Sequence, residues 1–407
     1  MNETSVDPLE LQPPAGLVTD IGRPRLAEWK RMRVWSSAHA VDDLYQGLVP
    51  AAIPFFVLER HYSYAAAAGL ALAATVGSAV PQLLIGLIAD RRPLLWMAPL
   101  GLILAGVGAG LAGLIHSYPA VFALLVLSGL GIAMFHPPAG RDARQAAEDS
   151  ATAMSYFAAG GSTGFFLAPA LATPALDAWG LHAMAFFIPP AVLMAAILAG
   201  HQRRRLAQTS ITAHHAATGR PCMFALLTVV ELTRSCISFG VNTFVSLYWI
   251  RHLGASSGLG GAALTLELAG GILGTLIGGR ISDRFGPTRT VQLGNCLLIP
   301  AFAVLLLCDN RYAALPLITI VGLITNIPFA VLIKLGQDYL PGRPGTAAGV
   351  TLGLAVSAGG LFQPVLGIVA DHHGPRGAFL VIAAIPLLAI ALAFNLKPAT
   401  HLPGQST

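Results

Sequence analysis

Long apolar runs, separated by short polar segments, follow one another along nearly the whole chain. Each run is close to the length of about 20 apolar residues that a helix needs to cross a bilayer. The alternating segments of about ten residues that are typical of membrane β-barrels do not occur. The pattern therefore predicts an all-α membrane protein with twelve transmembrane helices, near residues 34–58, 65–89, 94–115, 119–139, 150–172, 182–200, 222–250, 257–279, 289–307, 313–333, 345–370 and 377–395.

The longest polar segment between two runs divides the chain into two halves of six helices each. We expect no signal peptide, because the first segment lacks the apolar stretch and the cleavage site of one. The expected units are an N-terminal tail (1–33), an N-terminal half (34–200), a central cytoplasmic loop (201–221), a C-terminal half (222–396) and a C-terminal tail (397–407).

Composition and charge support this membrane assignment. Charged residues make up only 11% of the chain and hydrophobic residues 55%, which argues against a soluble enzyme. Of the 24 Lys and Arg residues, 18 fall in segments on the side of the termini and four in loops on the other side. By the positive-inside rule both termini are cytoplasmic, in the inner membrane of the cell. This placement accounts for the net charge of +5 without a nucleic-acid partner. The four cysteines show no metal-ligand spacing, so we expect no metal site and no cofactor.

A short motif, Gly-x-x-x-Asp-Arg, occurs twice at the cytoplasmic ends of the second and eighth runs. The copies are 193 residues apart. Glycine lets a neighbouring helix approach closely. The aspartate stands at a helix C-terminus, where the helix dipole disfavours an anion, so it needs a partner. The motif residues are Gly86, Asp90 and Arg91 in the first copy and Gly279, Asp283 and Arg284 in the second.

Ionisable residues inside the first run form a polar stripe. His39, Asp43 and Gln46, at positions i, i+4 and i+7, share one helical face. Because an ionisable group inside the membrane costs at least about 2.5–3.5 kcal/mol, it is a functional candidate by default. The stripe could carry protons or contact substrate, or it could be a static hydrogen-bonded pair. Asp42 lies about 100° round the helix and is the less favoured member.

The seventh run carries a second charged pair, Glu231 and Arg234, spaced i, i+3. Arg234 could contact Asp43 or an anionic substrate, because its planar guanidinium suits a phosphonate. Alternatively, the two residues neutralise each other locally. Two further candidates in the spans are His136 and Asn326. Glu267 could be a second proton site or a partner of Lys334, and Lys334 could instead pair with Asp338.

The repeated motif and the twelve spans resemble the major facilitator superfamily of transporters. This resemblance implies two pseudo-symmetric halves that rock about a central substrate site. It also implies that the motif aspartates, with nearby Arg141, lock one conformation. If the contacts of the family apply to this chain, Asp90 would face the start of span eleven near Gly345, and Asp283 would face the start of span five near Ser150. Alternatively, these charges are only topology anchors.

A glycine-rich stretch of span five that ends in proline resembles the antiporter motif of drug exporters. Close helix packing is an equally good explanation of this stretch. Its residues are Gly160, Gly161, Gly164 and Pro169.

Four further segments look like the fosmidomycin-resistance branch of these exporters: HAVDDLYQGLVPAAIP, GLGIAMFHPPAGRDA, YFAAGGSTGFFLAP and QDYLPGRPGTAAGVTLGL. The resemblance implies a monomeric, proton-coupled antiporter that exports a small drug or metabolite, with a fosmidomycin-like anion as one candidate. Three alternatives stay open: a proton symporter that imports a metabolite or metal complex, a non-transporting receptor, and a membrane enzyme. The enzyme is disfavoured because no nucleophile, metal or nucleotide motif accompanies the acid–base groups.

Overall fold

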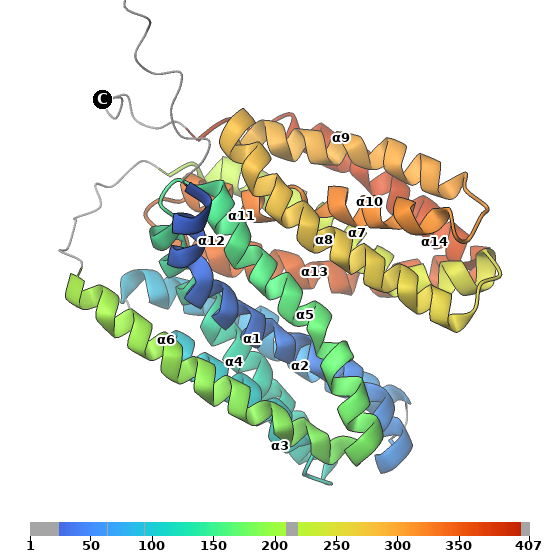
Figure 1. Ribbon diagram of the computed structural model, residues 1–407, viewed down its shortest axis with the longest axis horizontal. Helices are drawn as coiled ribbons and strands as arrows, with labels where there is room; N and C mark the ends of the chain where they lie inside the picture. The colour runs from blue at the N-terminus through green and yellow to red at the C-terminus, as the bar shows by residue number, and fades with distance from the viewer. Residues whose placement is uncertain (1–23, 63, 93, 209–218, 400–407) are drawn as a thin grey trace, which may run out of the picture.

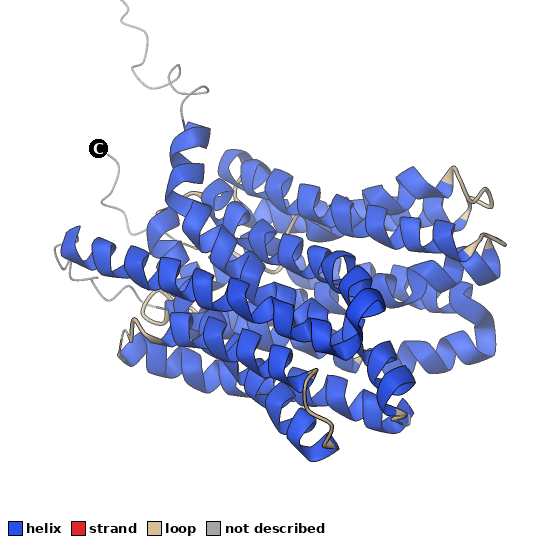
Figure 2. Cartoon of the chain, turned by 60° about the horizontal axis from the view of Figure 1, so that its bottom comes forward, coloured by secondary structure: helices blue, strands red, loops and turns tan. Residues whose placement is uncertain are grey.

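The computed structural model describes residues 24–62, 64–92, 94–208 and 219–399, and every regular element in these residues is a helix (Figures 1 and 2). A 3₁₀ segment, Gly180–Phe187, precedes α6, and π-helical turns follow α7 (Tyr248–His252) and α12 (Gly349–Leu354). The helices are α1 (Pro24–Arg60), α2 (Tyr64–Arg91), α3 (Met97–Ala112), α4 (Tyr118–Ala147), α5 (Ala151–Trp179), α6 (Ile188–Gln208), α7 (Pro221–Leu247), α8 (Ser257–Phe285), α9 (Pro287–Leu306), α10 (Ala314–Asn326), α11 (Phe329–Tyr339), α12 (Pro344–Ala348), α13 (Ala355–Leu361) and α14 (Gln363–Ala393).

The helices agree with twelve membrane crossings. Among the described residues, nine continuous helical stretches are long and apolar enough to cross a bilayer. Two of them, Ala151–Arg204 with 54 residues and Pro344–Ala393 with 50, are each long enough for two crossings. The shorter apolar helix Met97–Ala112 provides one more.

Several helix boundaries differ from the expected spans because of proline and glycine. Span ten is divided between α10 and α11 at Pro328, whose ring prevents a regular helical hydrogen bond. Spans eleven and twelve join without a loop inside α14, where Gly374 takes a φ of 70° before Pro375. Helix α6 continues into the expected central loop as far as Gln208, and α1 begins at Pro24, within the expected tail. Residues 1–23, 209–218 and 400–407, which include most of both expected tails and about half of the expected central loop, lie outside the described residues.

The helices form two bundles, one made of α1–α6 and one of α7–α14 (Figure 1). Within the first bundle α1 packs on α5, and α4 packs on α2 and α3; within the second, α8 packs on α10, and α7 on α14. The bundles meet through α5 with α8 and α11, and through α12 with α2 and α4. Polar contacts between the bundles gather at the end of the molecule where α1, α5 and α12 begin.

Close backbone packing brings α1 against α5. A Cβ added to Gly160 or Gly164 would collide with the carbonyl oxygens of Ser36 and Ala40. Small residues spaced four apart allow two membrane helices to approach in this way. The packing matters for function because it holds the polar face of α1 directly against α5.

Candidate functional site

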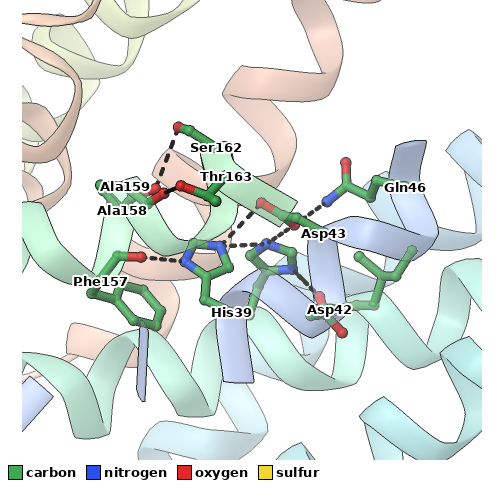
Figure 3. Close-up of polar contacts among 11 residues, drawn as sticks. His39, Asp42, Asp43, Gln46, Phe157, Ala158, Ala159, Ser162 and Thr163 are labelled. Atoms are coloured by element: carbon green, nitrogen blue, oxygen red, sulfur yellow. Dashed lines mark hydrogen bonds and ion pairs between the residues drawn. The ribbon is translucent and has the colours of Figure 1, made fainter. Parts of the chain in front are cut away.

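A compact polar cluster lies in the first bundle, where α1, α4 and α5 meet (Figure 3). We call His39, Asp43 and His136 the central cluster. His39 Nε2 lies 3.3 Å from Asp43 Oδ2, and His136 Nε2 lies 3.2 Å from Asp43 Oδ1. The two Nε2 atoms are themselves 3.3 Å apart. Both imidazoles are buried, while the Asp43 side chain is 15% exposed. The structure therefore brings His136, from α4, onto the stripe expected along α1.

The backbone determines the tautomer of both imidazoles in the central cluster. His39 Nδ1 lies 2.8 Å from the carbonyl oxygen of Phe157, and His136 Nδ1 lies 3.0 Å from that of Ile132. Because a carbonyl oxygen only accepts hydrogen bonds, each Nδ1 is assigned the proton. In a neutral imidazole the other nitrogen, Nε2, is then an acceptor. When both imidazoles are neutral, two Nε2 lone pairs and a carboxylate therefore face one another without a proton between them.

The neighbours of Asp43 leave the central cluster short of donors. The Gln46 side-chain amide donates to Asp43 Oδ1 at 2.8 Å. The hydroxyls of Ser162 and Thr163, which lie nearby on α5, donate back to carbonyls of their own helix (Figure 3). The cluster is therefore electrostatically satisfied only when it holds a cation, and a single proton is the smallest one available.

Asp42 is more closely involved than the sequence indicates. Its side chain is fully buried, with one carboxylate oxygen 3.3 Å from His136 Nδ1. Among the described residues neither oxygen has a hydrogen-bond partner, and that nitrogen is directed to the Ile132 carbonyl. Only the position of α4 reveals this proximity, and helix periodicity along α1 places Asp42 away from the polar stripe. Asp42 thus adds a fully buried carboxylate beside the partly exposed one of Asp43.

The glycines expected as an antiporter-like motif lie against α1. A Cβ at Gly161 would collide with Asp43 Oδ2 and with the His39 ring. Gly160 and Gly164 contact α1 backbone, as described above, and Pro169 lies farther along α5. These contacts provide a packing role for the three glycines, and an antiport role stays a prediction.

A second polar group lies in the other bundle and consists of Glu231, Arg234 and Asn326. Arg234 donates to Glu231 through Nε at 2.9 Å and through Nη2 at 2.6 Å. Its Nη1 donates to Asn326 Oδ1 at 3.3 Å, and its guanidinium lies 4.3 Å from the ring centroid of Phe329. Arg234 therefore forms the local pair with Glu231, which was one of its two expected roles. The described contacts of Asp43 do not include Arg234.

Breaking this pair from one side is expected to destabilise the protein. Glu231 is 0% exposed and Arg234 5%, so Glu231→Gln or Arg234→Gln leaves a buried charge without its partner, at a cost of about 3–5 kcal/mol. We expect each single variant to lower the melting temperature in detergent by more than about 5 °C. The double variant removes both charges and should recover part of the loss. Additive losses in the double variant would contradict this coupling.

Two other charged groups in the spans have different environments. Lys334 pairs with Asp338 at 2.8 Å, as the spacing predicts, and Asp338 also accepts from Arg144 of the first bundle at 2.7 Å. Glu267 is buried on α8, and its Oε2 has no hydrogen-bond partner among the described residues. Lys334 is therefore engaged by Asp338 rather than by Glu267.

The two motif aspartates each bind the start of a helix from the other bundle. Asp90 accepts hydrogen bonds from the backbone N–H groups of Gly345 and Thr346, at 2.6 and 2.7 Å. Asp283 accepts from those of Ala151 and Thr152, at 2.7 and 2.8 Å. Each also accepts from the threonine hydroxyl at 2.6 Å. Helix N-termini favour anions, so these contacts hold the two bundles together at this end.

The small and basic members of the motif surround these contacts. A Cβ at Gly86 would crowd the backbone of Gly345, and one at Gly279 would crowd Ala151 and Ser155. Arg141 donates to the carbonyl of Ala89 at the end of α2 and to Asp142. Arg91 and Arg284 are exposed, the latter beside the ring of Phe285. The glycines thus allow the two bundles to approach closely, and the aspartates hold them in this position through hydrogen bonds.

Comparison with known proteins agrees with this arrangement. A sequence model described as the Major Facilitator Superfamily matches residues 36–351 and 223–406. The fosmidomycin resistance protein of Escherichia coli (strain K12) is 27% identical over 398 residues, which cover 94% of this chain and 96% of that protein. The MFS-type transporter YfnC of Bacillus subtilis (strain 168) is 27% identical over 371 residues, covering 88% and 90%.

The fold also resembles that of a solved transporter structure. The crystal structure of the E. coli fucose:proton symporter superposes with a TM-score of 0.70 at 15% identity, covering 91% of this chain and 99% of the symporter. At this identity the likeness concerns the fold alone. Together with the family match over most of the described residues, it shows that the chain belongs to the Major Facilitator Superfamily and is a multi-pass membrane transporter of small molecules.

Proposed function

We propose that the protein is a proton-coupled antiporter that exports a small drug or metabolite across the inner membrane. The observation that carries this proposal is the central cluster, in which two imidazole acceptors and a carboxylate lie 3.2–3.3 Å apart. A proton placed among them replaces lone-pair repulsion by charge-assisted hydrogen bonds. The cluster lies near the middle of α1, where a proton site can be offered to either side in turn.

Energy for export would come from the proton gradient. Moving one charge across 100 mV is worth about 2.3 kcal/mol, which supports a concentration ratio of about 50 for each coupled proton. Protonation of the cluster on one side would weaken substrate binding, and loss of the proton on the other would restore it. Asp43 is the exchanging group in this scheme, because it touches both imidazoles and is partly exposed.

The motif contacts would set the direction of opening. If both termini are cytoplasmic, as the Lys and Arg distribution predicts, the bundles are fastened at their cytoplasmic ends. The described conformation would then be the outward-facing one. Release of Asp90 and Asp283 from their helix N-termini would allow the bundles to rock toward the inward-facing state.

The substrate class is proposed from the second polar group and from one relative. Arg234 contacts both the Asn326 amide and the Phe329 ring, so a small anion that displaced Glu231 would meet a guanidinium next to an amide and an aromatic ring. The E. coli relative is named for resistance to fosmidomycin. A fosmidomycin-like anion is therefore the first compound to test, and the functional unit would be a monomer.

Accumulation in sensitive cells tests the proposal. Cells that express the protein and cells with an empty vector would receive fosmidomycin and a panel of small anions and cations, each with and without an uncoupler. We expect expression to lower the accumulation of at least one compound, and the uncoupler to cancel the effect. Raised accumulation would favour the importing symporter, and unchanged accumulation of every compound would remove support for export.

A further inference from the structure

We propose that the central cluster of His39, His136 and Asp43 is also a binding site for a divalent transition-metal ion, with Zn²⁺ as the best-fitting ion. Sequence spacing does not indicate such a site, because the residues lie on two helices and form no short metal motif. One ligand atom from each of the three residues can be chosen so that all lie within 4.8 Å of one another.

The separations of the three donors match those around a tetrahedral zinc ion. Zinc binds imidazole nitrogen at about 2.0–2.1 Å and carboxylate oxygen at about 2.0–2.2 Å. Two ligands at a tetrahedral angle are then about 3.3–3.5 Å apart. The two Nε2 atoms are 3.3 Å apart, His136 Nε2 lies 3.2 Å from Asp43 Oδ1, and His39 Nε2 lies 3.3 Å from Asp43 Oδ2. The carboxylate thus presents a different oxygen to each imidazole, and it would rotate slightly to bind the ion through one of them. A small inward or outward shift of side chains would admit the ion.

Both imidazoles make the hydrogen bond that usually orients a metal-binding histidine. A histidine ligand donates its other ring N–H to a carbonyl or carboxylate, which fixes the tautomer and the ring orientation. His39 and His136 do so through the carbonyls of Phe157 and Ile132. The ring of Phe157 also stacks on that of His39, with centroids 4.3 Å apart. Both Nε2 lone pairs therefore point into the cluster without rearrangement of the protein.

Charge and access also suit a divalent ion. Asp43 supplies one negative charge as a ligand, and the buried carboxylate of Asp42 lies on the far side of His136. An ionised Asp42 would supply the second negative charge that offsets a dication in a low-dielectric setting. Because the Asp43 side chain is 15% exposed, the ion and a water as fourth ligand would enter from its side of the cluster. Two nitrogens and one oxygen favour zinc, copper or nickel over magnesium or calcium.

The metal and the proton would use the same lone pairs. A cluster that holds Zn²⁺ cannot also take a proton at Nε2 or at Asp43, so the metal would block transport. This consequence depends on the proposed function, whereas metal binding itself does not. The two are separated by measuring binding on the purified protein, in which no transport is required.

Titration calorimetry of the full-length protein in detergent, with Zn²⁺ as the probe and Mg²⁺ as the comparison ion, tests the site. We expect Asp43→Asn, which keeps the side-chain shape, and His136→Gln each to weaken zinc binding by more than about tenfold. The matched control is the double variant His372→Gln/His373→Gln, which removes a pair of exposed histidines on α14. It should leave the binding unchanged.

A second readout separates loss of the site from loss of the fold. Co²⁺ in place of zinc gives visible absorption whose intensity reports tetrahedral coordination by the protein. We expect these bands in the parent protein and in the control, and their absence in a monodisperse Asp43→Asn preparation. Zinc binding that survives Asp43→Asn and His136→Gln but disappears in the His372/His373 variant would place the metal on the surface and overturn the proposal.

Discussion

Asp43→Asn is expected to abolish uphill transport while leaving the protein folded. The asparagine side chain keeps the shape and can still accept from Gln46, but it cannot take up and release a proton. The coupled concentration ratio, about 50 per proton at 100 mV, should fall to about one. Proteoliposomes with an imposed proton gradient, loaded with a compound identified in cells, measure this ratio directly.

The control for this experiment is Asp177→Asn, which changes an exposed carboxylate on α5, away from the central cluster. It should transport as the parent does. Downhill exchange of substrate by Asp43→Asn would show that the variant still binds and rocks, so that only coupling is lost. Uphill transport by Asp43→Asn with an unchanged ratio would contradict the assignment of Asp43 as the exchanging group.

Much of the fold follows from patterns with simple physical causes. Apolar runs reflect the cost of polar groups in lipid, and they predict the membrane-spanning helices that the structure has. The placement of Lys and Arg predicts the orientation of these helices in the membrane, which stays a prediction. The partners of Asp90 and Asp283 were expected from the family resemblance, and the structure has both contacts. Helix breaks were harder to foresee. Pro328 divides a span, whereas Pro81 and Pro169 lie inside continuous helices.

The central cluster could be predicted only in part. His39, Asp43 and Gln46 share a face of one helix, so their proximity follows from helical periodicity. The contribution of His136 and Asp42 depends on how α4 packs against α1, which no local spacing encodes. The spacing of Glu231 and Arg234 allowed either a local pair or a longer reach, and the fully buried Glu231 favours the local pair in this conformation.

The aspartate contacts between the bundles give the second large prediction. Asp90→Asn replaces a carboxylate that accepts from two backbone N–H groups and the Thr346 hydroxyl. A hydrogen bond to a charged group is worth about 1.5–3 kcal/mol, so loss of one should shift the equilibrium toward opening at this end by about 10- to 150-fold. Asp283→Asn should act in the same direction through α5.

A buried cysteine reports this opening. Ser155 is 0% exposed and packs against Gly279 where α5 meets α8, so Ser155→Cys is a small change at the fastened end. In a background without the four native cysteines, a polar maleimide should modify this thiol faster when Asp90→Asn is added. Because Asp90 binds α12 rather than α5, faster labelling would mean that the two aspartate contacts open together. The exposed-carboxylate control Asp371→Asn should not change the rate, and an unchanged rate in Asp90→Asn would mean that the contact does not govern the opening.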